Sequence, residues 1–282
     1  MDEITLLLNS LHTRWEKYQA ELNTCNSEFS EGAVHDFRVA ARRLLSTLGF
    51  LRAVLQDPGI QKARRILKDQ LDNLDELRDV QALLADISEN IQEFPHLQPF
   101  EEYLLRREKK LLRNTRKEIK SLKTEDLSRR IRKLIKTIKT CTQADLDAGL
   151  FPVVDEAYAI VNQRYALIDP AQPATIHRLR IAFKKFRYMV EVVYPLLEDF
   201  PADHPKRMHD YQSIMGNIQD MEAAMHELTR FNKHIPANYD PKPLHTYYTE
   251  RHNTAISCYI EDKGEVVTFW RSAPDQPFPK EK

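Results

Sequence analysis

Apolar residues recur three and four positions apart along nearly the whole chain, which is the spacing of the buried face of an α-helix. Prolines and glycines interrupt this pattern and mark the joints between helices. The pattern predicts an all-α protein with helices over residues 3–24, 33–56, 61–90, 99–122, 126–142, 153–168, 174–198, 205–233 and 243–262. We expect Thr124 to cap the fifth helix and Pro195 to kink the seventh, because proline removes an internal hydrogen bond.

The composition narrows the possible classes of site. Only 6 of the 282 residues are glycine, well below the usual ~7%, which argues against glycine-rich nucleotide-binding loops. The first residues are acidic where a signal peptide needs bases, and no apolar run approaches the ~18 residues of a membrane span. Cys25, Cys141 and Cys258 show no CxxC spacing. We therefore expect a cytoplasmic protein with reduced thiols, no membrane association, no metal and no cofactor.

The chain contains an internal repeat. A shift of 142 residues aligns segment 34–44 with segment 176–186, and a further one-residue slip aligns 78–81 with 219–222. The first pair of segments shares a His, an Arg three residues later, and a basic pair seven and eight residues later, among apolar residues at matching positions. Such a duplication predicts two copies of one structural unit.

The length of 282 residues also suits two compact units. The prediction is therefore two pseudo-symmetric antiparallel helical bundles around a basic central cleft. We assign the first bundle to residues 1–148, the second to 149–270, and a loose proline-rich tail to 271–282.

Each copy carries a basic stripe on the helix face that lies away from its apolar residues. At ~100° per residue the members of a stripe fall within about 60° of one another. The stripes are His35, Arg38 and Arg42 in the first copy and His177, Arg180 and Lys184 in the second. Like charges three and four residues apart on a helix repel each other, so a bound anion would reduce this repulsion. The guanidinium of Arg can form two parallel hydrogen bonds to a phosphate, and the ammonium of Lys supplies a mobile positive charge. A nearby phosphate also favours the protonated, positively charged form of His.

The net charge of zero conceals strong local charge. Residues 68–102 hold ten acids and two bases, whereas residues 104–139 hold fifteen bases and four acids. Bases also occur at two helix starts, where the positive end of the helix macrodipole already disfavours positive charge. An anion bound at each helix start would offset both positive charges. These bases are Lys62, Arg64, Arg65, Lys206 and Arg207. A further basic row on the fourth helix consists of Arg106, Lys110, Arg113 and Lys117.

Two further pairs of residues are notable, of which only the first is related by the repeat. Asp79 and Asp220 are equivalent, and we expect each to form a helix-to-helix salt bridge that orients an Arg of the basic stripe. Gly49 and Gly216 lie inside helices, where glycine costs ~1 kcal/mol relative to alanine. We expect them to mark close contacts between helices.

At the basic stripes the sequence resembles the CHAD domain (conserved histidine α-helical domain) family, over roughly residues 4–265. The motif of that family is a helix that begins with a His, with an Arg three residues later and then a basic pair, present in two copies. The matching residues are His35, Arg38, Arg42 and Arg43 in the first copy and His177, Arg180, Lys184, Lys185, Arg187 and Tyr188 in the second.

The resemblance implies two antiparallel helical bundles around a basic central cleft that binds inorganic polyphosphate without catalysing a reaction. Leu45 departs from the motif, because Arg187 is its basic equivalent in the second copy. The two halves are therefore expected to contribute unequally. Many family members also carry a triphosphate-tunnel domain, whose ExExK signature is absent here, so a stand-alone binding module is expected.

An enzyme remains an alternative. HD-type metal-dependent phosphohydrolases are also helical and place His next to Asp, as in His35-Asp36 and His209-Asp210. That chemistry needs several ligands that converge on a metal. Adjacent helix residues diverge by ~100°, and the repeat replaces Asp36 by Arg178.

Sequence-independent binding of nucleic acid, with RNA the expected form, is the second alternative. It would use the phosphate backbone and the basic segment 104–139.

The favoured hypothesis is a non-enzymatic module that threads polyphosphate between two bundles, in the cytoplasm or on polyphosphate granules. The residues expected to grip phosphate are Arg38, Arg42, Arg180, Lys184 and Arg187, with His35 and His177 at the N-terminal ends of the stripes. Residues expected to widen the positive field are Arg43, Lys185, Arg64, Arg65, Lys206, Arg207, Arg106 and Arg113. The two histidines should strengthen binding as the pH falls towards ~6.5.

Overall fold

The protein is described here from a computed structural model that covers residues 2–55, 57–122, 124–142, 146, 149–235 and 239–280. Its helices are α1 Glu3–Glu28, α2 Glu31–Leu55, α3 Pro58–Asn90, α4 Gln98–Ser121, α5 Glu125–Thr140, α6 Phe151–Ala166, α7 Ala174–Val193, α8 His204–Phe231 and α9 Lys242–Asp262. Short 3₁₀ turns are η1 Pro95–Leu97, η3 Tyr194–Leu196 and η4 Lys263–Thr268. These residues contain no strand, so the all-α prediction is confirmed.

Local chemistry explains several helix boundaries. Asp2 caps α1 by accepting a hydrogen bond from the Thr5 amide at 2.9 Å. Asp57 caps α3 in the same way through the Gly59 amide, and Pro58 occupies the first turn, where its missing N–H costs nothing. These caps place the start of α3 three residues earlier than the sequence pattern predicts.

Two local predictions differ from the structure. Pro195 does not kink α7 but follows its end at Val193, within the turn η3, because the missing N–H stops the hydrogen-bond ladder. The fifth helix starts after Thr124 as expected, yet the Thr124 side chain makes no capping hydrogen bond. The predicted helix end at residue 56 and the predicted boundary at residue 148 lie outside the described residues.

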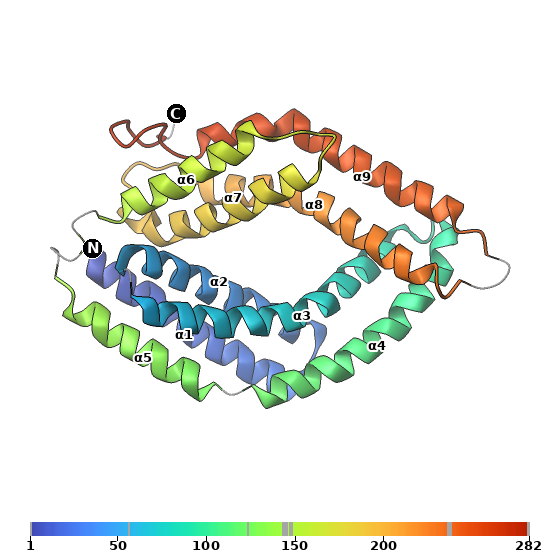
Figure 1. Ribbon diagram of the computed structural model, residues 1–282, viewed down its shortest axis with the longest axis horizontal. Helices are drawn as coiled ribbons and strands as arrows, with labels where there is room; N and C mark the ends of the chain where they lie inside the picture. Colours follow the sequence, from blue (N-terminus) through green and yellow to red (C-terminus); the bar gives the residue numbers. More distant parts are fainter. Residues whose placement is uncertain are drawn as a thin grey trace.

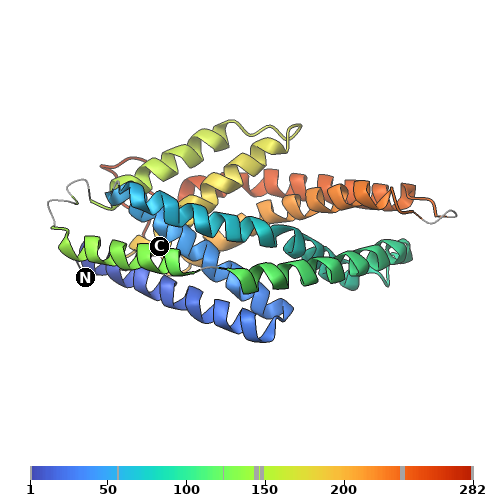
Figure 2. The same ribbon diagram turned by 60° about the horizontal axis from the view of Figure 1, so that its bottom comes forward.

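The two halves of the chain lie on opposite sides of the molecule, with α1–α5 below and α6–α9 above in Figure 1. Across the divide α2 packs on α7 and α3 packs on α8. Figure 2 shows α3, α4, α8 and α9 extending together towards the end of the molecule that lies away from both termini. The pseudo-twofold relation between the halves stays a prediction.

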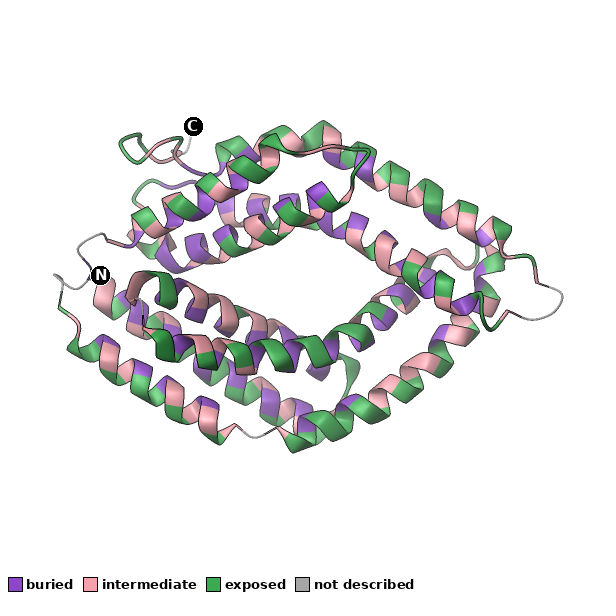
Figure 3. Cartoon of the chain, viewed as in Figure 1, coloured by how far each residue is buried: buried purple, intermediate pink, exposed green. Residues whose placement is uncertain are grey.

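The apolar core occurs in two clusters. The larger includes Phe37 and Phe183, both 0% exposed, and continues from the first half into the second. The smaller joins α3 and α4 to α8 and α9 around Phe100 and Phe231. Figure 3 shows the buried faces turned towards neighbouring helices. The halves therefore share a core, which fixes α2 against α7.

The segment after Trp270 is attached, not loose as expected. The Phe278 ring packs on Phe151 at 5.1 Å and on Trp270 at 4.8 Å between ring centroids. Arg271 donates from Nε to Asp155 Oδ1 at 2.9 Å. Up to Lys280 this segment therefore covers the start of α6. No helix in the described part of the chain has the length and hydropathy needed to cross a membrane.

Candidate functional site

A cavity of about 750 Å³ lies where α2, α3, α7 and α8 meet. Its charged lining residues are Arg38 and Arg42 from α2, Asp75, Arg78 and Asp79 from α3, Arg180 and Lys184 from α7, and Asp220, Glu222 and Glu227 from α8. These are five cations and five carboxylates. The expected basic cleft is therefore a cavity whose cationic side is α2 and α7, and whose mainly acidic side is α3 and α8.

Arg38 is the most deeply placed cation of the cavity, with an exposed fraction of 5%. Its Nη2 donates to Asp75 Oδ1 at 2.7 Å. Burial lowers the pKa of Arg38, and the Asp75 carboxylate offsets part of that effect. The second terminal nitrogen, Nη1, is buried and has no hydrogen-bond partner among the described residues. A buried donor without a partner is costly, so a ligand oxygen here would be stabilising.

Arg180 has the place of Arg38 in the second half, but its surroundings differ. In the alignment of the two repeat copies, Gly216 of α8 corresponds to Asp75 of α3, because each lies four residues before the equivalent aspartates Asp220 and Asp79. A Cβ at Gly216 would lie 3.8 Å from Arg180 Nη2, so the missing side chain leaves room for the guanidinium. Burial lowers the pKa of Arg180, and its Nε has no hydrogen-bond partner among the described residues. Arg180 thus lacks the carboxylate that holds Arg38.

Arg42 and Lys184 complete the cationic side from α2 and α7. Both are half-buried, and neither forms an ion pair with a described residue. Burial, together with the nearby charges of Arg42 and Arg180, lowers the pKa of Lys184 to about 8, against a smaller raising effect of Asp75. Arg42, Arg180 and Lys184 thus lie in one cavity, and none of them forms an ion pair with a described carboxylate. Such an arrangement is typical of an anion-binding site.

Only one of the two predicted histidines lies at the cavity. His177 lines the cavity, where its Nδ1 contacts Gln219 Oε1. Gln219 in turn donates from Nε2 to Glu222 Oε2 at 2.6 Å, which holds the imidazole against α8. His35 is exposed at the start of α2 and is not a lining residue.

Asp79 and Asp220 do not form the salt bridges that the repeat suggests. The carboxylate that pairs with Arg38 is Asp75, one helical turn before Asp79. Neither Asp79 nor Asp220 makes an ion pair or hydrogen bond within the described chain, although both line the cavity. Burial raises the pKa of both carboxyls. The charge of Asp75 adds to this for Asp79, and Arg180 opposes it for Asp220.

Three other members of the predicted motif lie outside the cavity. Arg43 and Lys185 are exposed, one residue beyond Arg42 and Lys184. Arg187 is buried and committed to protein contacts. Its Nη1 donates to Glu191 at 2.8 Å and its Nε donates to Gln212 at 3.0 Å. The structure thus gives Arg187 a packing position instead of the phosphate-gripping position expected for it.

The bases at the two helix starts are also not gathered at the cavity. Arg64 packs against Gly49 and donates to Gln61 at 3.0 Å, while Arg65 is exposed. Lys206 pairs with Asp210 at 2.7 Å and Arg207 pairs with Glu265 at 2.8 Å. At the start of α8, Asp210 and Glu265 thus supply the negative charge for which the sequence suggested a bound anion, whereas Arg64 at the start of α3 contacts the neutral amide of Gln61.

Arg106 and Arg113 are exposed on α4, away from the cavity. With the exposed bases of α5 they make the exposed surface of α4 and α5 rich in positive charge.

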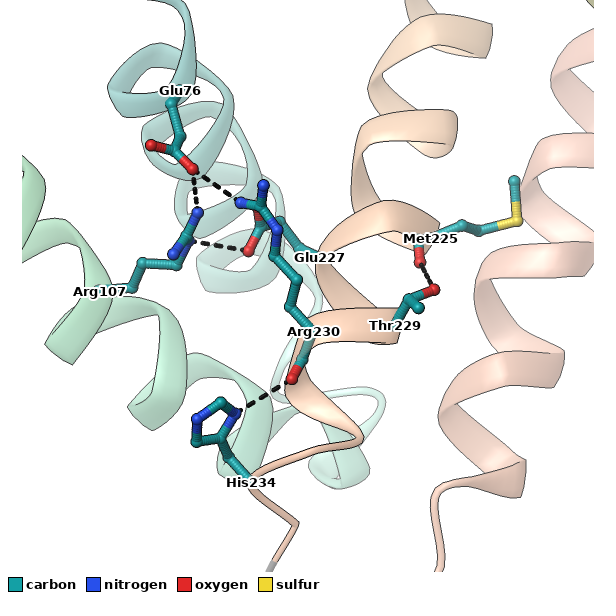
Figure 4. A network of polar contacts seen from close by, with 7 residues as sticks. All are labelled: Glu76, Arg107, Met225, Glu227, Thr229, Arg230 and His234. Atoms are coloured by element: carbon teal, nitrogen blue, oxygen red, sulfur yellow. Dashed lines mark hydrogen bonds and ion pairs between the residues drawn. The ribbon is translucent and has the colours of Figure 1, made fainter.

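An ion-pair network that the sequence did not reveal borders the cavity at Glu227 (Figure 4). Glu227 lines the cavity and is only 4% exposed. It pairs with Arg107 of α4 at 2.9 Å and with Arg230 at 2.9 Å, and Glu76 of α3 contacts both arginines. The network ties α3 and α4 to α8. The only sequence signal was the acidic run over residues 68–102, which gives no partners.

Neither His-Asp pair belongs to a cluster of metal ligands in the described part of the chain. No group of three or more His, Cys, Asp or Glu side chains that could hold a metal ion occurs there. His35 and Asp36 are both exposed on α2, and His209 and Asp210 are both exposed on α8.

Comparisons with known proteins give a consistent family and fold. The CHAD domain family matches residues 10–229. A crystal structure of the CHAD domain from the plant Ricinus communis superposes with a TM-score of 0.68 at 17% identity, over 94% of this chain and 89% of that one. PptA from Streptomyces chartreusis gives a TM-score of 0.72 at 15% identity, over 93% of this chain and 99% of that one. No curated protein matches the chain.

At such low identities the two structural matches show the fold alone. The family match rests on the sequence itself and covers most of the chain, including both basic stripes and the helices that line the cavity. The chain belongs to the CHAD domain family.

Proposed function

We propose that the protein binds inorganic polyphosphate on the cationic side of the central cavity, without a chemical step. The observation that carries the proposal is the convergence of Arg42, Arg180 and Lys184 in one half-buried place without carboxylate partners. Charge-assisted hydrogen bonds from such groups to phosphate oxygens are about twice as strong as neutral ones. A phosphate chain would satisfy the unpartnered donors of Arg38 and Arg180 at the same time.

The lining favours bare phosphate over nucleic acid. The only rings among its described residues are the imidazoles of His177 and His226. Tyr188, the aromatic residue of the second stripe, lies under Arg187 at 4.6 Å from the guanidinium carbon. Single-stranded nucleic acids are usually held by aromatic side chains on which bases stack, and the cavity offers none.

The carboxylates change the expected path of the chain. Asp79, Asp220 and Glu222 occupy the side opposite the cations, and a polyanion threaded straight through would have to pass them. A chain that enters and leaves along α2 and α7 avoids most of this repulsion. We therefore favour a bound segment of a few phosphate units over a fully threaded chain.

RNA binding remains the second candidate because of the exposed basic face of α4 and α5. Arg106 and Arg113 belong to it, and such a face would contact a phosphate backbone without reading the sequence. It uses residues separate from the cavity, so variants can distinguish the two surfaces. Action in the cytoplasm or at polyphosphate granules belongs to the proposal.

The proposal is tested by calorimetric titration of the purified protein with long-chain polyphosphate, tripolyphosphate, single-stranded RNA and duplex DNA at two salt concentrations. The expected result is tight binding of polyphosphate and much weaker binding of both nucleic acids. Equal affinity for all polyanions, with the same steep salt dependence, would show a general basic surface instead.

A further inference from the structure

The cavity holds two unpaired carboxylates beside its unpaired cations. Asp79 from α3 and Asp220 from α8 line the same 750 Å³ as Arg42, Arg180 and Lys184, and neither carboxylate makes an ion pair or hydrogen bond with a described residue. The other acids of the lining are engaged. Asp75 holds Arg38, Glu222 accepts from Gln219, and Glu227 belongs to the ion-pair network.

An independent observation shows that this cavity is incomplete without a ligand. Arg38 lines the cavity and is only 5% exposed. Its Nη1 donor has no hydrogen-bond partner among the described residues. Arg180 Nε is in the same condition. An anion would supply the acceptors that these donors lack. Yet an anion bound to them lies within one small cavity of two negative side chains, which repel it.

We propose that Asp79 and Asp220 bind a Mg²⁺ ion carried by the phosphate chain, so that the ligand is a magnesium–polyphosphate complex. This inference rests on the proposed function. Mg²⁺ is usually held by one or two carboxylates together with substrate phosphates and several waters, and not by a cage of protein ligands alone. Two carboxylates and a phosphate chain supply this donor set. The ion converts the repulsion between chain and carboxylates into attraction.

The surroundings also provide space for a hydrated ion. Asp79 and Asp220 stand in the wall between the central cavity and a neighbouring cavity of about 440 Å³. Asn217 and the small residue Ala82 line both cavities. Because no third metal-ligating side chain joins the two aspartates within the described chain, the site is complete only when phosphate is present. The protein alone should therefore bind Mg²⁺ weakly.

The test compares polyphosphate affinity with Mg²⁺ and with sodium at matched ionic strength. For a purely cationic site, Mg²⁺ lowers the affinity because it neutralises the ligand. The proposal predicts the opposite sign: Mg²⁺ should raise the affinity of the wild-type chain by about fivefold or more, and polyphosphate should raise the Mg²⁺ affinity by the same factor, since coupling is reciprocal.

The variant pair Asp79→Asn with Asp220→Asn should lose this Mg²⁺ effect while still binding polyphosphate in sodium. A matched control, Asp72→Asn with Asp210→Asn, removes the same charge from exposed positions of α3 and α8 outside the cavity and should keep the effect. Circular dichroism on both pairs checks that they fold.

Three results separate the claims. A Mg²⁺ enhancement lost only in the Asp79 and Asp220 variant supports the metal site. Weaker binding in Mg²⁺ for wild type and both variants would overturn it while leaving polyphosphate binding intact. No binding of polyphosphate by the wild-type chain in either condition would overturn the proposed function, and the metal site with it.

Discussion

Lys184 gives the sharpest test of the electrostatic account, because its ammonium group is placed unfavourably in the free protein. It lies in the cavity with Arg180 on its own helix, Arg38 and Arg42 on α2, and Asp75 on α3. Burial and the arginines lower its pKa from 10.5 to about 8, against the smaller opposing effect of Asp75. At pH 7 this difference corresponds to about 3 kcal/mol of destabilisation by the charged amine.

The substitution Lys184→Met removes the charge and keeps an unbranched, flexible side chain that is one atom shorter. We expect the variant to be more stable than wild type at pH 7 by up to about 3 kcal/mol. Between the folded pKa of about 8 and the unfolded value of 10.5, the unfolded wild-type chain binds more protons. Wild-type stability therefore rises with pH across this window. The advantage of the variant should be full below pH 8 and should disappear above about pH 10.5.

Urea unfolding of both proteins at several pH values, followed by circular dichroism, measures this difference. A second arm adds polyphosphate, which should reverse the order of stability because the anion pairs with the Lys184 ammonium. A variant that is less stable than wild type at pH 7, or a difference that does not change with pH, would refute the reasoning.

Two further substitutions test other parts of the cavity. Gly216→Asp should place a carboxylate beside Arg180 as Asp75 stands beside Arg38, and should lower polyphosphate affinity about tenfold. Gly216→Asn adds similar volume without charge, so an equal loss in both variants would point to steric blocking instead. Glu227→Gln should destabilise the protein by about 1–3 kcal/mol, because two arginines lose a buried partner. In a urea titration the exposed control Glu250→Gln should change stability by less than about 0.5 kcal/mol, and equal effects would show that the network contributes little.

The sequence was sufficient for the helices because the apolar spacing and the cap residues are local signals. Phe37 and Phe183, which belong to the apolar faces that lie away from the two basic stripes, are fully buried. Pro195 was misjudged because the same missing N–H can bend a helix or end it. The attachment of Phe278 to Phe151 and Trp270 joins distant parts of the chain, and no local pattern shows it.

For the site, helical spacing placed Arg38 on one face with Arg42, and Arg180 on one face with Lys184, because residues three and four apart share a face. The family resemblance, not the spacing, implied that both faces line one central cleft, and all four residues line the cavity. Spacing could not show which charges meet across helices. Arg187 fits the motif but pairs with Glu191 and Gln212.

The acidic side of the cavity was missed for the same reason. Asp75 lies in a segment interpreted only as an acidic run, and Glu227 lies in a segment for which the sequence gave no charge pattern. Their partners Arg38 and Arg107 come from other helices. Asp79, singled out by the repeat, lines the cavity without the expected salt bridge.

The central claim is that the unpaired cations of the cavity hold the phosphate chain, and one calorimetric comparison tests it directly. The pair Arg42→Gln with Lys184→Gln removes two cavity charges, whereas Arg43→Gln with Lys185→Gln removes two charges from the next, exposed positions of the same helices. Loss of two charge-assisted contacts should weaken polyphosphate binding by about 100-fold or more in the cavity pair. The exposed pair should change it by no more than about fivefold. Equal losses in the two pairs would contradict the account and assign binding to the general surface charge.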